Sequence, residues 1–159
     1  MLRHLKQAGR VVRLARDHRG EAWLASRLAF SVAAFTVLIK LLPLPRALSL
    51  LSPGTRNPAP REQTVSEERL AQLLDSVLGL NFLCFTPICW KRAAVLHRQL
   101  ALRGRDTRVI FGLRKDGGDL LAGHAWIESD GQPLFETTAP TYAVTYSFPP
   151  EPSQAAARS

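Results

Sequence analysis

The most constraining feature of the sequence is a cysteine placed where a helix is predicted to begin, followed by a histidine on a later strand. Thr86 is suited to the N-cap of this helix, and Pro87 to its first position, where the missing N–H is no loss. Cys89 would then be the third helical residue, close to exposed N–H groups and to the positive end of the helix dipole, which stabilise a thiolate. Together with His124 on the strand, it predicts the two halves of a thiol nucleophile.

The flanking sequence predicts helices first and strands afterwards. Thr64 and Glu67 have the spacing of a capping box, and an apolar stripe follows them as far as Gly79, where a helix would end. The helix that carries Cys89 would run to Gly104. Beyond it, apolar and β-branched residues predict three strands, over residues 107–113, 120–128 and 132–137. This order predicts an α+β fold in which the cysteine-bearing helix packs on a small antiparallel sheet.

The first fifty residues predict an additional helical region. One helix is expected from Glu21 to Leu42, and a short one from Arg46 to Leu51 after the prolines at 43 and 45. The uncharged stretch from Leu28 to Ile39 is too short to span a bilayer, which needs roughly 20 apolar residues, so we expect this helix to be buried or to dock on a partner or a membrane surface. We predict four regions: a helical amino-terminal region (1–51), a proline-rich linker (52–63), a catalytic domain (64–148) and a loosely ordered tail (149–159).

Charge and cysteine content limit the compartment and the partners. The net charge is +8, and basic residues crowd the first twenty positions, which suits an anionic membrane surface, an acidic protein or simple solvation. Zinc-finger spacing and helix-turn-helix signals are missing from the sequence, so nucleic acid is not expected as a partner. Two cysteines make no disulfide framework and no signal peptide is recognisable, which predicts a reducing, cytoplasmic location.

Cys84 and His97 are the competing candidates for nucleophile and base. Cys84 is predicted to lie in a loop with no helix start behind it, and a disulfide between it and Cys89 would disarm the site. His97 lies two turns along the same helix, roughly 12 Å from Cys89 along the axis at 1.5 Å per residue, and so cannot touch the thiol. His124 is therefore the predicted base.

The neighbours of His124 also favour a site. Gly123 and Ala125 are small and would let another element approach closely. Trp126 lies on the same strand face as His124 and would shield it from water.

A third residue that orients the imidazole is expected from the hairpin that follows. The turn contains Asp130 and Gly131. A two-residue turn would place Thr137 opposite His124, whereas a three-residue loop would place Glu136 there, and opposed residues have Cβ atoms about 5 Å apart. Glu136 is the predicted acid. Asp130 stays as the alternative, although turn chemistry explains it well.

Several of these segments resemble the leader peptidase of lasso-peptide biosynthesis, a family of transglutaminase-like cysteine proteases. The similar segments are the cysteine helix (89–104), the strand at 109–115, the His-Ala-Trp strand and hairpin (123–131), and residues 41–46. The resemblance implies a transglutaminase/papain-like core, with Cys89 as nucleophile and His124 as base. Glu136 stands where the family usually has an aspartate.

The resemblance also implies the partners. It implies a stand-alone peptidase that cleaves a precursor peptide after its leader, together with a separate leader-recognition protein and a cyclase of the same pathway. No cofactor and no metal are expected from the sequence. An acyl-transferring transglutaminase or amidase would use the same Cys89–His124 pair, and a peptide-binding adaptor would carry a merely structural cysteine, so both alternatives stay open.

Overall fold

The structure is a computed structural model that describes residues 19–52, 65–81, 85–116 and 121–150. The described residues form helices and one antiparallel sheet with the strand order β3-β2-β1-β4. In chain order the elements are α2 (Arg19–Leu41), α3 (Leu44–Leu51), α4 (Glu67–Leu78), α5 (Cys89–Ala101), β1 (Arg108–Lys115), β2 (Leu121–Ser129), β3 (Gln132–Leu134) and β4 (Ala143–Phe148). The predicted α+β class is confirmed.

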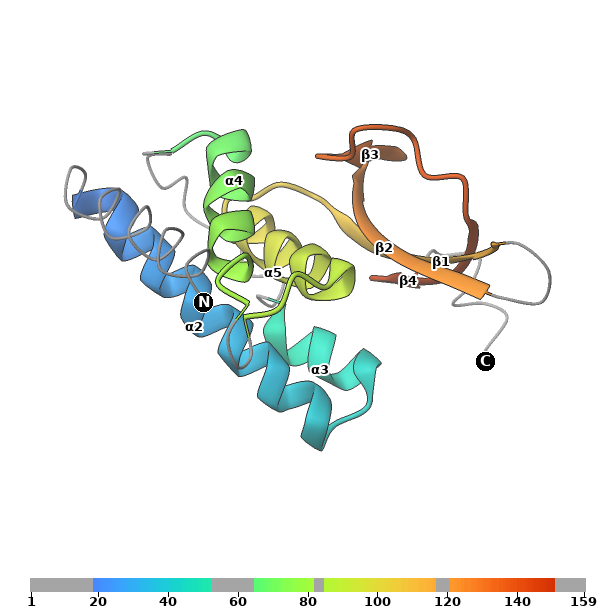
Figure 1. The fold of residues 1–159 in the computed structure, drawn as a ribbon, viewed down its shortest axis with the longest axis horizontal. Helices are drawn as coiled ribbons and strands as arrows, with labels where there is room; N and C mark the ends of the chain where they lie inside the picture. The colour runs from blue at the N-terminus through green and yellow to red at the C-terminus, as the bar shows by residue number, and fades with distance from the viewer. Residues whose placement is uncertain (1–18, 53–64, 82–84, 117–120, 151–159) are drawn as a thin grey trace.

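Helix α5 is the centre of the molecule, since it lies between the other helices and the sheet (Figure 1). It packs on β1 and β2 on one side and on α2, α3 and α4 on the other. A helix between two layers is covered on almost every side, and this explains why its buried residues do not form a single stripe. They are Lys91, Ala93, Ala94, Val95, Leu96, His97, Gln99 and Leu100. The core therefore holds the cysteine-bearing helix firmly against the sheet.

Helix α2 contributes one face to this core. Leu28, Val32 and Phe35 recur at helical spacing and are fully buried. At the start of the helix, the Glu21 carboxylate pairs with the Arg69 guanidinium of α4 at 2.9 Å. The sequence predicted that the apolar helix either packs on the catalytic domain or docks on a partner, and this face packs on α4 and α5.

The predicted start of α4 is wrong by two residues. The N-cap is Ser66, whose hydroxyl oxygen accepts a hydrogen bond from the N–H of Arg69 at 3.2 Å. The capping box proposed at Thr64 is therefore not the start of the helix, and Thr64 itself lies outside the described residues. Ser66 directly precedes the helix, whereas Thr64 lies two residues further away. The side chain of an N-cap reaches only the second and third helical amides, so Ser66 is the better placed of the two. The predicted end at Gly79 is confirmed.

The sheet departs from the prediction at its end. β3 stops at Leu134, three residues earlier than predicted, because Phe135 adopts a left-handed conformation with φ of 59° that ends the ladder. The prediction contained no strand after residue 137, whereas β4 pairs with β1 from Val109 to Leu113. The predicted linker and tail lie almost entirely outside the described residues, as does the start of the predicted amino-terminal helical region.

Candidate active site

Cys89 is the first residue of α5, and its free thiol is half-buried. The N-cap is Ile88, whose carbonyl accepts hydrogen bonds from the N–H groups of Lys91 and Arg92 at 3.1 and 3.2 Å. The sequence placed the N-cap at Thr86, which is wrong, because the Thr86 hydroxyl instead accepts a hydrogen bond from the Lys91 ammonium at 3.0 Å. The consequence for the thiol is small. Cys89 moves from the third to the first helical position and stays beside the amides that a helix start leaves without intrahelical partners.

The first turn of α5 favours an anion at Cys89. It contains no acidic residue and two cationic ones, Lys91 and Arg92. The positive end of the helix dipole acts in the same direction. The dipole and the exposed N–H groups of the helix start therefore suit a negatively charged group at this position.

His124 lies on β2 with its ring directed toward Glu136. The imidazole Nε2 and the Glu136 Oε2 are 3.1 Å apart, and the side chains are 25% and 18% exposed. Since Nε2 is engaged by the carboxylate, Nδ1 is the ring nitrogen left to exchange a proton with a thiol. The predicted base and the predicted acid are thus brought together.

Glu136 reaches His124 by a different route from the one predicted. Ser129 pairs with Gln132, so the turn has two residues, Asp130 and Gly131, both with positive φ. This register would place Thr137 opposite His124 if the ladder continued. It does not continue, because the left-handed turn at residue 135 ends β3 and redirects the chain. The predicted three-residue loop is wrong, but the contact of Glu136 with His124 that was inferred from it is present.

Asp130 is fully accounted for by the turn. Its φ of 52° is the left-handed conformation that a two-residue hairpin turn requires and that aspartate tolerates better than most residues. Its side chain is exposed. The site geometry therefore favours Glu136 over Asp130 as the partner of His124.

Two aromatic rings contact the imidazole of His124. Trp126 stacks on the imidazole, with ring centroids 5.8 Å apart and an angle of 18° between the planes. Tyr142, on the segment that leads to β4, contacts the same ring with a centroid distance of 5.3 Å. Trp126 thus lies against His124 on the same strand face, as predicted. Tyr142 was not anticipated because it precedes a strand that was missed.

A glycine on the neighbouring strand makes room for these rings. Gly112 of β1 pairs with His124, and a Cβ atom at Gly112 would lie 2.6 Å from Tyr142 Cβ and 3.0 Å from Trp126 Cη2. The close approach that the sequence analysis assigned to Gly123 therefore occurs at Gly112. A Cβ at Gly123 would meet only the Leu113 side chain at 3.6 Å, an ordinary contact.

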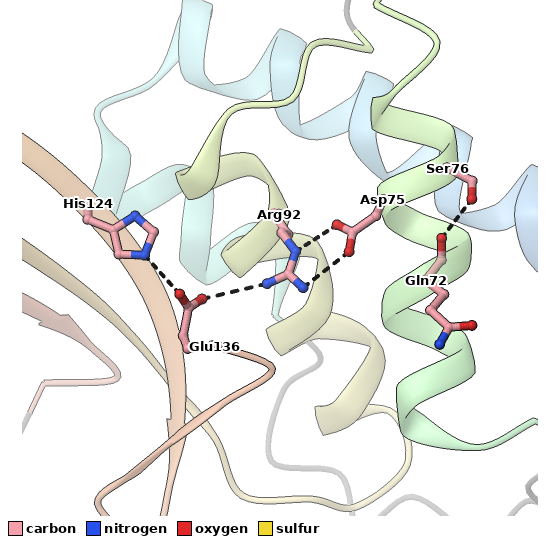
Figure 2. A network of polar contacts seen from close by, with 6 residues as sticks. All are labelled: Gln72, Asp75, Ser76, Arg92, His124 and Glu136. Carbon is pink, nitrogen blue, oxygen red and sulfur yellow. Dashed lines mark hydrogen bonds and ion pairs between the residues drawn. The ribbon is translucent and has the colours of Figure 1, made fainter. Parts of the chain in front are cut away.

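Arg92 connects the His124–Glu136 pair to the helices (Figure 2). Its Nε and Nη2 donate to the two carboxylate oxygens of Asp75 on α4, at 2.7 and 3.2 Å. Its Nη1 lies 3.7 Å from Glu136 Oε1. Arg92 is one turn along α5 from Cys89, so the arginine and the thiol project from neighbouring positions on the helix. The chain Asp75–Arg92–Glu136–His124 brings the histidine strand to the start of the cysteine helix.

Packing supports the same convergence. Cys89 and Trp90 lie against the core cluster that contains Ala125 and Ile127 of β2, on either side of Trp126. A pocket of about 340 Å³ opens beside His124 and Glu136. Its other lining residues are Arg114, Thr137, Thr138, Ala139, Pro140, Thr141 and Tyr142. This pocket could take a polar segment of a ligand next to the His124–Glu136 pair.

His97 has a structural role. It is 5% exposed, its Nδ1 lies 2.9 Å from Thr107 Oγ1, and its Nε2 lies 3.1 Å from Ser52 Oγ. Burial lowers its pKa, more strongly than Asp106 and the backbone hydrogen bond of Thr107 raise it. The imidazole thus ties the end of α3 to α5 and to the start of β1, which agrees with its exclusion as the base.

The remaining candidates concern Cys84 and metals. Cys84 lies outside the described residues, so only the sequence argument ranks it below Cys89 as the nucleophile. Among the residues that the structure describes, no group of three His, Cys, Asp or Glu side chains is arranged to hold a metal ion.

The fold and the site define a class of protein: an α+β domain with a cysteine at the start of a central helix and a histidine–carboxylate pair on the adjoining sheet. A family model described as transglutaminase-like superfamily matches residues 28–147. The chain belongs to the transglutaminase-like superfamily. No curated protein and no solved structure matches it. Membership indicates chemistry of the cysteine-protease or acyltransferase type.

Proposed function

We propose that this protein is a cysteine peptidase that removes the leader from a ribosomally made precursor peptide in lasso-peptide biosynthesis. The observation that carries the proposal is the contact of His124 Nε2 with Glu136 Oε2 at 3.1 Å, on a strand packed against the helix that begins with Cys89. Membership of the superfamily supports the class of chemistry. The resemblance of residues 89–104, 109–115 and 123–131 to lasso leader peptidases supports the finer assignment.

The mechanism assigns one role to each residue. Nδ1 of His124 takes the thiol proton of Cys89, and the thiolate sulfur attacks the carbonyl carbon at the leader–core junction. Backbone N–H groups at the start of α5 hold the oxyanion that forms. The imidazolium then protonates the leaving amine, so the core is released with a free amino terminus and the leader stays on sulfur as a thioester.

Water completes the cycle. His124 removes a proton from water, the resulting hydroxide attacks the thioester carbonyl, and the thiolate leaves and is reprotonated. Glu136 holds the ring orientation and stabilises the imidazolium in both halves of the reaction. The pocket beside Glu136 would hold the segment of the precursor next to the cleaved bond. A separate recognition protein would deliver the leader.

The nucleophile is tested first without any substrate. Iodoacetamide should label Cys89 in the native protein near neutral pH faster than it labels free cysteine, and peptide mapping separates this label from one on Cys84. Replacement His124→Ala should slow the labelling to the rate of an ordinary thiol. A native Cys89 that reacts as slowly as a free thiol would instead indicate a non-catalytic adaptor.

The reaction is tested with a lasso precursor peptide and a separate leader-recognition protein. Wild type should cut the precursor once and add one water, and Cys89→Ala should be inactive while Cys84→Ala keeps wild-type activity. Cleavage by Cys89→Ala at the wild-type rate would overturn the proposal. Products that have gained an amine in place of water would assign the protein to the acyltransferases of the superfamily.

A further inference from the structure

The outward face of α2 carries a line of exposed apolar side chains. Trp23, Phe30 and Val37 follow one another at intervals of seven residues, and Leu41 lies one turn further on. Their exposed fractions are 62%, 75%, 55% and 74%. A spacing of seven returns to nearly the same side of an α-helix, so these residues form one stripe, called here the outer stripe. The opposite face of α2 is already packed in the core.

The charged residues of α2 and α3 are mostly basic, with Arg19, Arg27, Lys40 and Arg46 against the single acid Glu21. Residues 1–52 contain nine Lys or Arg and two Asp or Glu, so they account for +7 of the net charge of +8. One of these two acids, Glu21, is already paired with Arg69 at 2.9 Å. Lys40 and Arg46 are exposed near the end of the stripe. Basic residues beside the stripe favour an anionic partner. The aromatic and aliphatic side chains of the stripe favour a lipid surface over a nucleic acid, because they can enter the interfacial layer.

A small pocket between α2 and α5 adjoins the stripe. It measures about 230 Å³ and is lined by Ser26, Arg27, Phe30, Ser31, Arg98 and Gln99. Phe30 therefore belongs to both the stripe and the pocket. Arg98 has a lowered pKa, chiefly because of burial and further because of the positive charge of Arg27. An anion between two guanidinium groups that repel each other would relieve this repulsion and accept their hydrogen bonds.

We propose that α2 docks the protein on an anionic phospholipid membrane, with the outer stripe in the interfacial layer and a lipid phosphate between Arg27 and Arg98. Residues Gly20–Leu41 make α2 the one described helix that is long and apolar enough to cross a membrane, with a mean hydropathy of 1.7. The uncharged stretch from Leu28 to Ile39 is only part of this helix. A spanning orientation would nevertheless remove Leu28 and Phe35, both fully buried, from the core. The helix therefore lies along the membrane surface.

Flotation of the full-length protein with lipid vesicles tests this proposal. The protein should float with vesicles that contain phosphatidylglycerol and stay behind with vesicles of phosphatidylcholine alone, and salt should weaken the binding. Phe30→Gln should weaken binding to the vesicles by about tenfold, because the variant lacks the phenylalanine ring whose transfer from water into the interfacial layer favours binding. The matched control is Leu121→Gln on β2, which is 63% exposed and outside the stripe, and it should bind as wild type does.

Arginine variants test the phosphate contact. Arg27→Gln should reduce the preference for anionic vesicles, and Arg27→Lys should keep most of it because the charge remains. Circular dichroism checks that each variant is folded. Equal flotation of wild type and Phe30→Gln overturns the proposal. So does a failure of wild type to float with anionic vesicles, which would make an acidic protein surface the better candidate for the stripe.

Discussion

Arg92 Nη1 lies 3.7 Å from Glu136 Oε1, on the other side of the carboxylate from His124. The same guanidinium is fixed by two hydrogen bonds to Asp75 on α4. The third residue of the candidate triad is therefore held from both sides, by the imidazole that it orients and by an arginine on the cysteine helix. This relationship predicts that Arg92 is a positioning residue, which would act on the reaction through Glu136.

Replacing Arg92 should lower turnover more than stability. Arg92→Gln leaves Glu136 free to turn away from His124, and we expect kcat to fall about tenfold to a hundredfold with little change in KM. Arg92→Lys keeps the charge but cannot engage Asp75 and Glu136 together, so its kcat should lie in between. The matched control is Arg105→Gln, which removes an ion pair with Glu67 at 3.1 Å elsewhere and should leave kcat unchanged. A parallel loss of Tm and activity in both Arg92 variants would point to a structural role alone.

The identity of the acid is tested by a pair of matched variants. Glu136→Gln keeps the size of the side chain but removes the charge that orients and stabilises the imidazolium, and kcat should fall at least about a hundredfold. Asp130→Asn should leave kcat unchanged, because asparagine tolerates the left-handed turn conformation equally well. Single-turnover cleavage assays measure both. The assignment is wrong if Asp130→Asn is the variant that loses activity.

The room made by Gly112 predicts a strong difference between two glycines. In Gly112→Ala the new methyl group would lie 2.6 Å from Tyr142 Cβ, an atom close to the backbone that cannot easily move away. We expect a loss of about 1–3 kcal/mol in the free energy of unfolding, together with lower activity as Trp126 and Tyr142 shift around His124. Gly123→Ala should affect both far less, since its methyl group meets only Leu113 at 3.6 Å. Urea unfolding and cleavage assays on the two variants decide this.

The elements that the sequence predicted well are those whose signals are local. A few neighbouring residues are enough to indicate the break at Pro43, the glycine that ends α4 and the alternation in β1 and β2. Helix starts were less secure, because Thr64, Ser66 and Thr86 are all acceptable N-caps by composition. Which residue caps the helix depends on where tertiary packing begins the first turn.

The missed features depend on contacts between distant segments. β4 pairs with β1 across thirty residues or more, so no hairpin turn in the sequence indicates the pairing. Val144, Thr145 and Tyr146 nevertheless have strand propensity. Arg92 could have been suspected from its position one turn after Cys89, but its two carboxylate partners come from α4 and from the chain after β3. The contact of Glu136 with His124 required the left-handed conformation of Phe135, which nothing in the local sequence indicates.

Burial of His97 predicts a pH dependence of stability. Its lowered pKa means that the folded protein resists protonation, whereas in the unfolded chain the imidazole titrates near its ordinary value of about 6.5. Below this pH the unfolded state binds more protons, so the free energy of unfolding decreases as the pH falls, and above about 7.5 both states are neutral at this residue. Wild type should therefore lose Tm between pH 7.5 and pH 5.5. His97→Gln, which cannot be protonated, should be less stable at pH 7.5 because the hydrogen bonds to Ser52 and Thr107 are altered, but its Tm should fall less over the same range. An equal fall in both proteins would show that another group is responsible.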